Sequence, residues 1–318
     1  MRRWMIAACL ALMPAAGSAM EISVTQWGNS LTGLPYAVAL ESHMFQKAGI
    51  DVTGIIGSGG GGTTVRNMLA SPLPYGEVSL AAALAAARQG LDVVIVNVGS
   101  LSLPESSVVT RPESTVKSIA DLAGKRVAIT SPRGVSDMVL QMALKAKGLD
   151  LSATTRVVAG GYGQGLVMLD HDAVDAASLI EPLSIMRRDR YRTVFEATDI
   201  LPPMVTLVGI TTRQYARAHQ EEIRALIAGR REAVRWIYAN PVAVEPILAR
   251  SFKVEPAVAH EAAARMIKFH MWSEGNFVPV ELDRFAEGLK LVGEIEKLPD
   301  WSTIIDTVYL PADLQAKP

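Results

Sequence analysis

A glycine-rich loop is the first feature of this sequence that suggests ligand binding. Residues 57–62 read Gly-Ser-Gly-Gly-Gly-Gly, and two threonines follow at 63 and 64. Glycines let a ligand approach backbone N–H groups closely, and the first turn of the helix that follows favours an anion. We therefore expect Gly59, Gly60 and Thr63 to contact an oxyanion. A merely flexible loop is the alternative.

The same loop formally matches the dinucleotide-binding pattern G-x-G-x-x-G, and Glu77 follows twenty residues later. That pattern also requires an apolar strand leading into the acidic residue, and the sequence before Glu77 does not indicate one. No Gly-Lys-Ser/Thr follows the glycines either, so the loop is not a Walker A motif. Nucleotide binding is therefore disfavoured.

A second loop, 131–137, reads Ser-Pro-Arg-Gly-Val-Ser-Asp between a predicted strand and a predicted helix. The hydroxyls of Ser131 and Ser136, the guanidinium of Arg133 and the backbone near Gly134 are suited to a sulfonate or carboxylate. An ordinary turn, with Ser136 as a helix cap and Arg133 in solvent, is the alternative.

Four further residues belong to the candidate site. Ligands of open α/β sheets bind beyond the carboxyl ends of strands, where we place the loop 26–30 with Trp27 and Ser30. Tyr162, in a glycine-rich loop, is a candidate for the opposing wall, and Glu181 for contact with a cationic amine. The alternatives are a Trp27 that packs in the core or a hinge, and a solvated Glu181.

Several chemistries lack their residues. The sequence has no G-x-S-x-G motif, its single cysteine is Cys9, and its five histidines lack metal-ligand spacing. We therefore predict no catalytic residue, no metal and no cofactor. With 31 Lys and Arg against 32 Asp and Glu, the chain also lacks the basic field that nucleic acids require.

The elements that position these loops alternate between strands and helices, which is typical of an α/β fold with a buried parallel sheet. A first α/β unit is followed by a second one, then by a further strand and mostly helices. We expect two lobes with a ligand cleft between them: a first part of lobe 1 over 20–104, lobe 2 over 105–204, and a return to lobe 1 with C-terminal helices over 205–318. The strands are predicted at 21–26, 51–56, 91–98, 107–110, 125–130, 156–158, 173–179 and 205–210.

Residues 1–19 are predicted to be a secretory signal peptide. Arg2 and Arg3 precede a short apolar run, and small residues precede a cleavage site after Ala19. We therefore expect a periplasmic protein. Lipidation at Cys9 is the alternative, although too few apolar residues separate Cys9 from the arginines.

The sequence also resembles a known family. The segments LPYAVALE at 34–41, FQKAGIDV at 45–52, IADLAGKRVA at 119–128, VDAA at 174–177 and Glu-Pro at 181–182 are similar to periplasmic substrate-binding proteins for taurine, aliphatic sulfonates and nitrate. These proteins serve ABC importers.

The resemblance implies a type II periplasmic-binding-protein fold, in which two mixed sheets flanked by helices close around one small ligand. It further implies docking on an ABC permease in the inner membrane, and we expect a monomer. By position, the family's ligand loops correspond to Trp27, Ser30, 59–63, Ser100, 131–136 and Tyr162. Two positions depart from the family pattern: Ser79 stands where Asp is usual, and Asp172 where Gly is usual.

Two other functions fit the same fold. One is an enzyme similar to thiamine-pyrimidine synthase or to the desulfinases, whose cysteine motifs this chain lacks apart from Cys9. The other is an exported sensor that reports to a membrane histidine kinase. The resemblance leaves sulfonates, nitrate, aromatic acids and pyrimidine-like molecules as candidate ligands.

Overall fold

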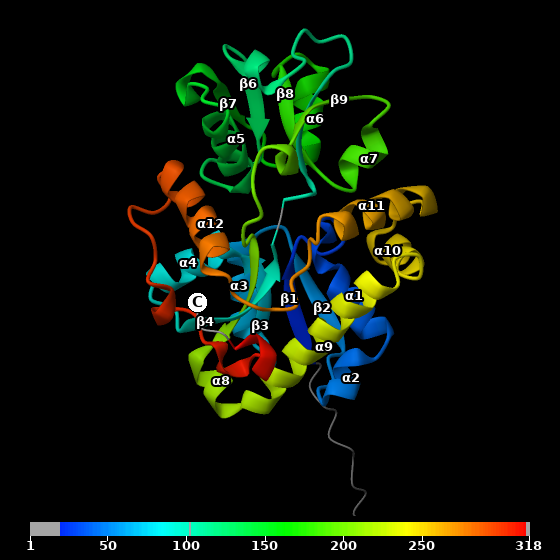
Figure 1. The fold of residues 1–318 in the computed structure, drawn as a ribbon, viewed down its shortest axis with the longest axis vertical. Helices are drawn as coiled ribbons and strands as arrows, with labels where there is room; N and C mark the ends of the chain where they lie inside the picture. Colours follow the sequence, from blue (N-terminus) through cyan, green and yellow to red (C-terminus); the bar gives the residue numbers. More distant parts are fainter. Residues whose placement is uncertain (1–19, 102, 316–318) are drawn as a thin grey trace, which may run out of the picture.

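The computed structural model describes residues 20–101 and 103–315, which form two lobes, each built on a five-stranded sheet (Figure 1). The predicted signal peptide and Cys9 lie outside the described residues. No helix in the described ranges combines the length and hydrophobicity needed to cross a membrane.

The first sheet has the strand order β2-β1-β3-β10-β4. The strands β1, β2 and β3 are parallel, whereas β10 runs antiparallel to both of its neighbours. A strand from late in the chain therefore joins two early strands that do not pair with each other. The bounds are β1 (Glu21–Thr25), β2 (Gly54–Ser58), β3 (Tyr75–Ser79), β4 (Val93–Ser100) and β10 (Leu207–Thr212).

We call this sheet and the helices packed on it lobe 1. The long helix α9 contacts α1 and α2, and its apolar stripe includes Ile223, Leu226 and Val234, which are fully buried. The helices of lobe 1 are α1 (Leu34–Glu41), α2 (Met44–Ala48), α3 (Gly61–Ala70), α4 (Leu80–Arg88), α8 (Arg213–Ala218), α9 (Gln220–Ala239), α10 (Glu245–Phe252), α11 (Pro256–Lys268) and α12 (Pro279–Leu291).

The second sheet, with order β7-β6-β8-β5-β9, is the centre of lobe 2. Here β6, β7 and β8 are parallel, and β5 runs antiparallel to β8 and β9. The elements are β5 (Ser106–Thr110), β6 (Arg126–Ile129), α5 (Val135–Ala146), β7 (Thr155–Val158), α6 (Tyr162–Asp170), β8 (Ala176–Ile180), α7 (Leu183–Arg187) and β9 (Arg192–Glu196).

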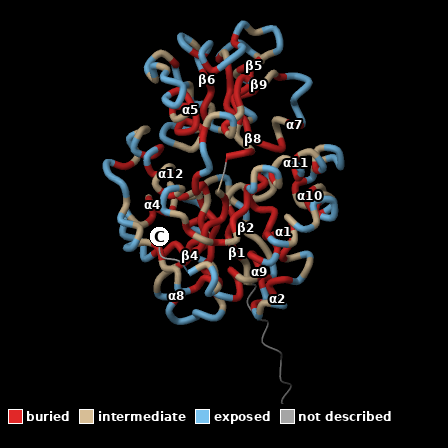
Figure 2. Tube along the Cα trace, in the orientation of Figure 1, coloured by how far each residue is buried: buried red, intermediate tan, exposed pale blue. Residues whose placement is uncertain are grey.

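Each sheet lies in a buried layer, with exposed segments at the periphery of both lobes (Figure 2). The lobes are joined where the chain leaves β4 and where it returns before β10. There Met204 N donates to Leu101 O at 2.7 Å, and the hydroxyls of Ser100 and Thr206 bond each other. The two crossings therefore run side by side.

Ion pairs also link the lobes. Arg265 on α11 donates to Pro104 O at 2.9 Å and to Glu196 at the end of β9 at 2.8 Å. Arg188, just after α7, donates to Glu261 on α11 at 2.8 Å. Helix α11 thus connects lobe 1 to lobe 2 on one side of the molecule.

The predicted α/β fold with two mixed sheets, as the family resemblance implies, is confirmed. The parallel pairing expected from the strand pattern holds for β1, β2 and β3 and for β6, β7 and β8, but β10 and β5 run antiparallel to their neighbours. A left-handed φ of 55° at His43 separates α1 from α2. Two strands were missed: β3 includes Gly76, Glu77 and Ser79, and β9 is mostly polar or charged.

Candidate functional site

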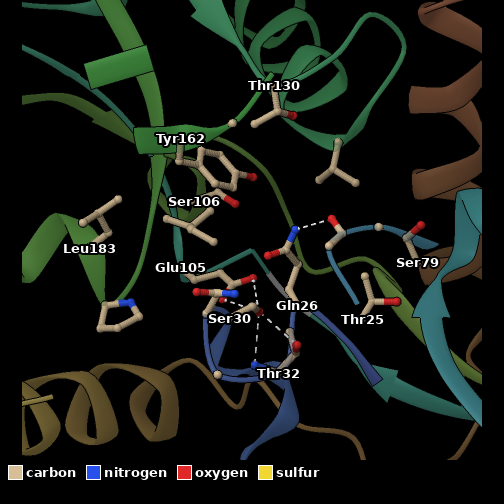
Figure 3. A pocket seen from close by; sticks show the side chains of 18 of the residues that line it. Thr25, Gln26, Ser30, Thr32, Ser79, Glu105, Ser106, Thr130, Tyr162 and Leu183 are labelled. Carbon is tan, nitrogen blue, oxygen red and sulfur yellow. Dashed lines mark hydrogen bonds between the residues drawn. The ribbon is translucent and has the colours of Figure 1, made fainter. Parts of the chain in front are cut away.

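A cavity of about 740 Å³ lies between the lobes and is lined by residues of both (Figure 3). Lobe 1 contributes the loops after β1 and β2, the end of β3 and the end of α10. Lobe 2 contributes the loops before α5, α6 and α7. The lining residues are Thr25, Gln26, Gly28, Asn29, Ser30, Thr32, Gly59, Gly60, Gly61, Ser79, Leu103, Glu105, Ser106, Thr130, Ser131, Val135, Gly160, Gly161, Tyr162, Gly163, Ile180, Pro182, Leu183, Met186, Thr206, Leu207, Phe252, Lys253 and Val254.

The first two loops of lobe 1 are bound to each other. Gln26 has a left-handed φ of 56°, its backbone N–H donates to Ser58 O at 2.7 Å, and its side-chain amide donates to Gly59 O at 2.6 Å. Figure 3 draws the hydrogen bond of the Gln26 amide as a dashed line. This bridge fixes the position of the glycine backbone against the first strand.

The glycine run has two different roles. A Cβ on Gly61 would lie 2.4 Å from the Cβ of Ala82, so Gly61 permits α3 to pack closely against α4. A Cβ on Gly59 or Gly60 would meet no atom within 4 Å. These two glycines therefore leave the cavity open where α3 begins.

The helices that start at this cavity include α3, α5 and α6. Gly60 and Gly61 stand at the start of α3, Val135 at the start of α5, and Tyr162 at the start of α6. The first N–H groups of a helix have no partner within the helix, and its dipole favours negative charge there. The prediction from sequence placed two such helix starts at the cleft, and α6 adds a third.

Of the twelve predicted ligand residues, the structure places five on the cavity wall: Ser30, Gly59, Gly60, Ser131 and Tyr162. The other seven do not line it, for reasons that the local contacts give. They are Trp27, Thr63, Ser100, Arg133, Gly134, Ser136 and Glu181.

Trp27 packs within lobe 1 instead of facing the cavity. The Trp27 side chain packs against Gly33 and Gly57. A Cβ added at Gly33 would lie 2.9 Å from the indole ring, and a Cβ added at Gly57 would lie 3.1 Å from the Trp27 Cβ. The ring centroid is 6.1 Å from that of Phe252, which does line the cavity. Trp27 therefore packs within lobe 1, as the alternative interpretation stated, and its ring lies next to Phe252 on the side away from the cavity.

Two predicted hydroxyls of lobe 1 are engaged elsewhere. Ser100 is 1% exposed and bonds Thr206, and Thr206 is the residue that reaches the cavity. Thr63 is exposed on α3 and accepts a hydrogen bond from Arg66 at 2.9 Å. Helix α3 begins at Gly61, and Thr63 lies on the exposed side of its first turn, away from the cavity wall.

The loop before α5 approaches the cavity through Thr130, Ser131 and Val135. The Ser136 hydroxyl accepts from the backbone N–H of Thr130 at 2.9 Å, so it ties the loop to the strand. Arg133 is exposed, and its left-handed backbone donates to Asp137 at 2.9 Å. The loop is therefore an ordinary turn between a strand and a helix, which was the alternative interpretation. Arg133 does not place a positive charge at the cavity wall.

Gly134 supports Ser131 without facing the cavity itself. A Cβ at Gly134 would lie 2.4 Å from the Ser131 Oγ, so the glycine makes room for that hydroxyl. Gly134 thus affects the cavity only by leaving space for the Ser131 side chain.

Glu181 is 4% exposed and lies behind the wall that Pro182 forms. Its carboxylate accepts from the backbone N–H of Ile185 at 3.1 Å and lies 3.7 Å from the Arg265 Nε. Burial raises the pKa of Glu181, and the Ser184 hydrogen bond and Arg265 lower it. Glu181 therefore neither lines the cavity nor lies in solvent. Its carboxylate binds a backbone N–H in the first turn of α7.

Glu105 is the main cavity residue that sequence reasoning missed. It lies in the crossing between the lobes, beneath Tyr162 and beside Ser30 (Figure 3). The Ser30 hydroxyl donates to its two carboxylate oxygens at 2.9 and 3.1 Å. Burial raises the pKa of Glu105 to about 7, partly offset by hydrogen bonds from Ser30 and the Leu31 backbone. Its segment has no motif, so only the fold reveals it.

The remaining wall divides into a polar part and an apolar part. Missed hydroxyls and amides surround the helix starts, among them Thr25, Asn29, Thr32, Ser79, Ser106 and Thr130. Leu103, Leu183, Met186 and Phe252 supply apolar surface. Within the described ranges, no group of three or more His, Cys, Asp or Glu residues is arranged to hold a metal ion.

Comparisons with solved structures agree on the fold. The chain is similar to the periplasmic aliphatic sulphonate binding protein SsuA from Escherichia coli, with a TM-score of 0.73 and 16% identity over 92% of this chain and 93% of that one. The nitrate-binding protein NrtA from Synechocystis PCC 6803 gives a TM-score of 0.61 and 14% identity over 78% and 70% of the chains.

An enzyme shares the same fold. The desulfurization enzyme DSZB gives a TM-score of 0.65 and 14% identity, covering 91% of this chain and 97% of that one. Among curated protein sequences, no match was found. The model of the NMT1/THI5-like family matches residues 32–244, more than half of the sequence. This chain, with its two mixed sheets and the cavity between them, belongs to the NMT1/THI5-like family.

Proposed function

We propose that this protein is the periplasmic solute-binding component of an ABC importer. It binds a small oxyanion-bearing molecule between its lobes and presents the closed form to a permease in the inner membrane. The observation that carries the proposal is the convergence of three helix starts, those of α3, α5 and α6, on one cavity between the lobes. Sulfonates, nitrate and aromatic acids are the ligand classes we consider.

The size and wall of the cavity favour an organic anion over a bare inorganic one. A volume of about 740 Å³ falls in the range of small-molecule sites, roughly 300–1,000 Å³. The apolar side chains of Leu103, Leu183, Met186 and Phe252 would contact a hydrocarbon or aromatic part. The N–H groups at the helix starts would hold the charged group.

The position of the cavity supports a closing motion. Its walls belong to two lobes that are joined by two adjacent crossings, so a ligand that contacts both walls favours the closed arrangement. Closure of this kind gives a permease a surface that differs between the empty and the loaded protein.

A thermal-shift panel on residues 20–318 tests the proposal. Alkanesulfonates, arenesulfonates, nitrate, benzoates and pyrimidines would each be added, and small-angle scattering would follow compaction. A ligand at about 100 times its Kd stabilises the protein by about 2.7 kcal/mol, which is a shift of several degrees. We expect a sulfonate or aromatic acid to raise Tm and reduce the radius of gyration. Stabilisation by pyrimidines alone would contradict the oxyanion assignment.

A glycine variant tests the role of the α3 start. We expect Gly60→Ala to weaken oxyanion binding about tenfold, because the methyl group would project where nothing lies within 4 Å and keep the anion from the backbone. Calorimetric titration measures the affinity, and Tm should stay unchanged. Gly62→Ala, on the exposed side of the same helix start, is the matched control. Equal affinities for the two variants would remove this loop from the site.

A further inference from the structure

A second, much smaller cavity lies inside lobe 2, and we call it the side cavity. It has a volume of about 10 Å³ and adjoins the ligand cavity, because Ser106 and Tyr162 line both. Figure 3 shows these two side chains next to each other on the wall of lobe 2. The residues that line the side cavity are Ser106, Ser107, Val108, Ser136, Val139, Leu140, Tyr162, Ser178 and Leu179.

Buried hydroxyl groups border the side cavity without a partner of their own. The Oγ atoms of Ser107 and Ser178 make no hydrogen bond to any residue that the structure describes, and the two residues are only 4% and 7% exposed. Buried polar groups of folded proteins are nearly always hydrogen-bonded, because an unpaired one has lost its bonds to water without replacement. These hydroxyls therefore need a partner from outside the protein chain.

The register of the sheet directs Ser178 into the side cavity. Ser178 pairs with Val108, and directly paired residues of two strands have their side chains on the same face. Val108 belongs to the same buried cluster as Leu140 of α5, so α5 covers this face. The Ser178 hydroxyl thus lies between the sheet and α5. Ser107 pairs with Leu179 instead, so its hydroxyl points to the opposite face.

Two further serines supply hydrogen-bonding groups from other elements. Ser136, in the first turn of α5, accepts from the backbone N–H of Thr130 and bonds the Thr130 hydroxyl, each at 2.9 Å. A serine hydroxyl has one proton and two lone pairs, so these two bonds leave Ser136 with capacity for a third. Ser106, the first residue of β5, adds another hydroxyl.

We infer that the side cavity is a binding site for one water molecule, held by the hydroxyls of Ser178, Ser136 and Ser106. A cavity of about 10 Å³ has room for a single water. A buried water makes about three hydrogen bonds, which is the number that these serines offer. Water both donates and accepts, so it suits hydroxyls whose protons can rotate.

The water joins three elements of lobe 2 at the wall of the ligand cavity. Ser178 belongs to β8, Ser136 to α5 and Ser106 to β5. A water bound to all three fixes the first turn of α5 against the sheet, beside Tyr162. The site goes beyond the proposed function, because the water is bound whether or not the ligand cavity is occupied.

Removing the Ser178 hydroxyl distinguishes a hydrated side cavity from a dry one. If the cavity holds water, Ser178→Ala takes away one of its partners, and we expect Tm to fall by about 2 °C. In a dry cavity the same variant would remove an unpaired polar group, so Tm would stay constant or rise.

Ser23→Ala is the matched control for this measurement. Ser23 on β1 is fully buried and its hydroxyl also lacks a partner within residues 20–101 and 103–315, but it lines neither cavity. We expect the Tm of Ser23→Ala to stay constant or rise.

The water itself is counted by oxygen-17 magnetic relaxation dispersion on residues 20–318 without added ligand. Ser178→Val replaces the hydroxyl by a methyl group and adds a second methyl group that fills the side cavity. We expect this variant to contain one long-lived internal water fewer than the unchanged protein. A high-resolution crystal structure should show the water within hydrogen-bond distance of the Ser178 Oγ, and its loss in Ser178→Val.

Three results would overturn the inference. One is a crystal structure of the unchanged protein without a water between Ser106, Ser136 and Ser178. Another is a folded Ser178→Val variant with the same number of internal waters. The third is a Tm of Ser178→Ala that stays constant or rises as in the Ser23→Ala control. If Ser178→Val fails to fold, the crystal structure and Ser178→Ala decide.

Discussion

Two glutamates, the fully buried Glu77 in lobe 1 and the half-buried Glu105 between the lobes, lie in opposite electrostatic settings. Glu77 is 0% exposed, accepts from the Tyr36 hydroxyl at 2.9 Å and lies 3.4 Å from the Arg230 Nε. Burial raises its pKa, and the charge of Arg230 is the largest opposing influence. Glu105 is half-buried beside a cavity, and within residues 20–101 and 103–315 no cation acts on its carboxyl.

The network around Glu77 holds lobe 1 together. Arg230 on α9 donates to Gly99 O at 2.6 Å and to Ser273 O at 2.8 Å, so one side chain joins three parts of the lobe. The Tyr75 hydroxyl, with its pKa raised to about 12 by burial, donates to Asn97 at 2.9 Å. Glu77 therefore serves the fold together with its cation, whereas Glu105 lies on the cavity wall.

The largest effect should follow from removing the cation of Glu77. We expect Arg230→Met to lower the free energy of unfolding by about 3–5 kcal/mol, because it leaves a charge buried without its partner. Urea unfolding at pH 7 measures the loss. The double variant Glu77→Gln/Arg230→Met should recover part of it. A loss below about 1 kcal/mol would show that the pair does not hold the lobe.

Removing the charge of Glu105 at the cavity should raise the free energy of unfolding, whereas the change at Arg230 lowers it. The pKa of Glu105 in the folded protein, about 7, lies above that of an unfolded glutamate, so the folded state binds more protons between pH 4.5 and 7. Stability due to this group is therefore lost as the pH rises through that window. We expect Glu105→Gln to stabilise the ligand-free protein by about 1–3 kcal/mol at pH 8, with little change at pH 4.5.

Unfolding curves at the two pH values check the sign for Glu105. A destabilised Glu105→Gln at pH 8 would show that this carboxylate serves the fold, as Glu77 does, and would remove the distinction between the two sites.

A smaller effect is expected at the link between the lobes. Arg265→Ala removes the bonds from α11 to Pro104 and Glu196, and we expect a loss of about 1–2 kcal/mol, since the guanidinium is only 24% exposed. The pKa of Glu196, raised to about 6 by burial against the lowering charge of Arg265, should rise further in this variant. Carboxyl titration by NMR measures that shift. An unchanged Glu196 titration would show that the pair does not form in solution.

The sequence predicts the loops of the site better than the side chains that face the cavity. The glycine run and the loop 131–136 do lie at helix starts beside the cavity, because strand, turn and helix signals are local. Arg133 and Trp27 were the most conspicuous residues of their loops. A left-handed turn exposes Arg133, and Trp27 packs against Gly33 and Gly57.

The residues that were missed depend on contacts between distant segments. Glu105 acquires its setting from Ser30 and Tyr162, which are 75 and 57 positions away in the chain. Strand β3 was missed because Glu77 interrupts its apolar pattern, and the partner that explains a buried acid there, Arg230, is on α9. No local window contains either relation.

The place of β10 in the first sheet sets an order for folding. Strands β3 and β4 each pair with β10 and not with each other, so lobe 1 cannot close its sheet until residues 207–212 are available. The second sheet is drawn entirely from residues 106–196 and needs no later strand. During synthesis from the N-terminus, lobe 2 can therefore complete its sheet first. The edges of β3 and β4 stay unpaired until β10, which follows lobe 2 in the chain, has been made.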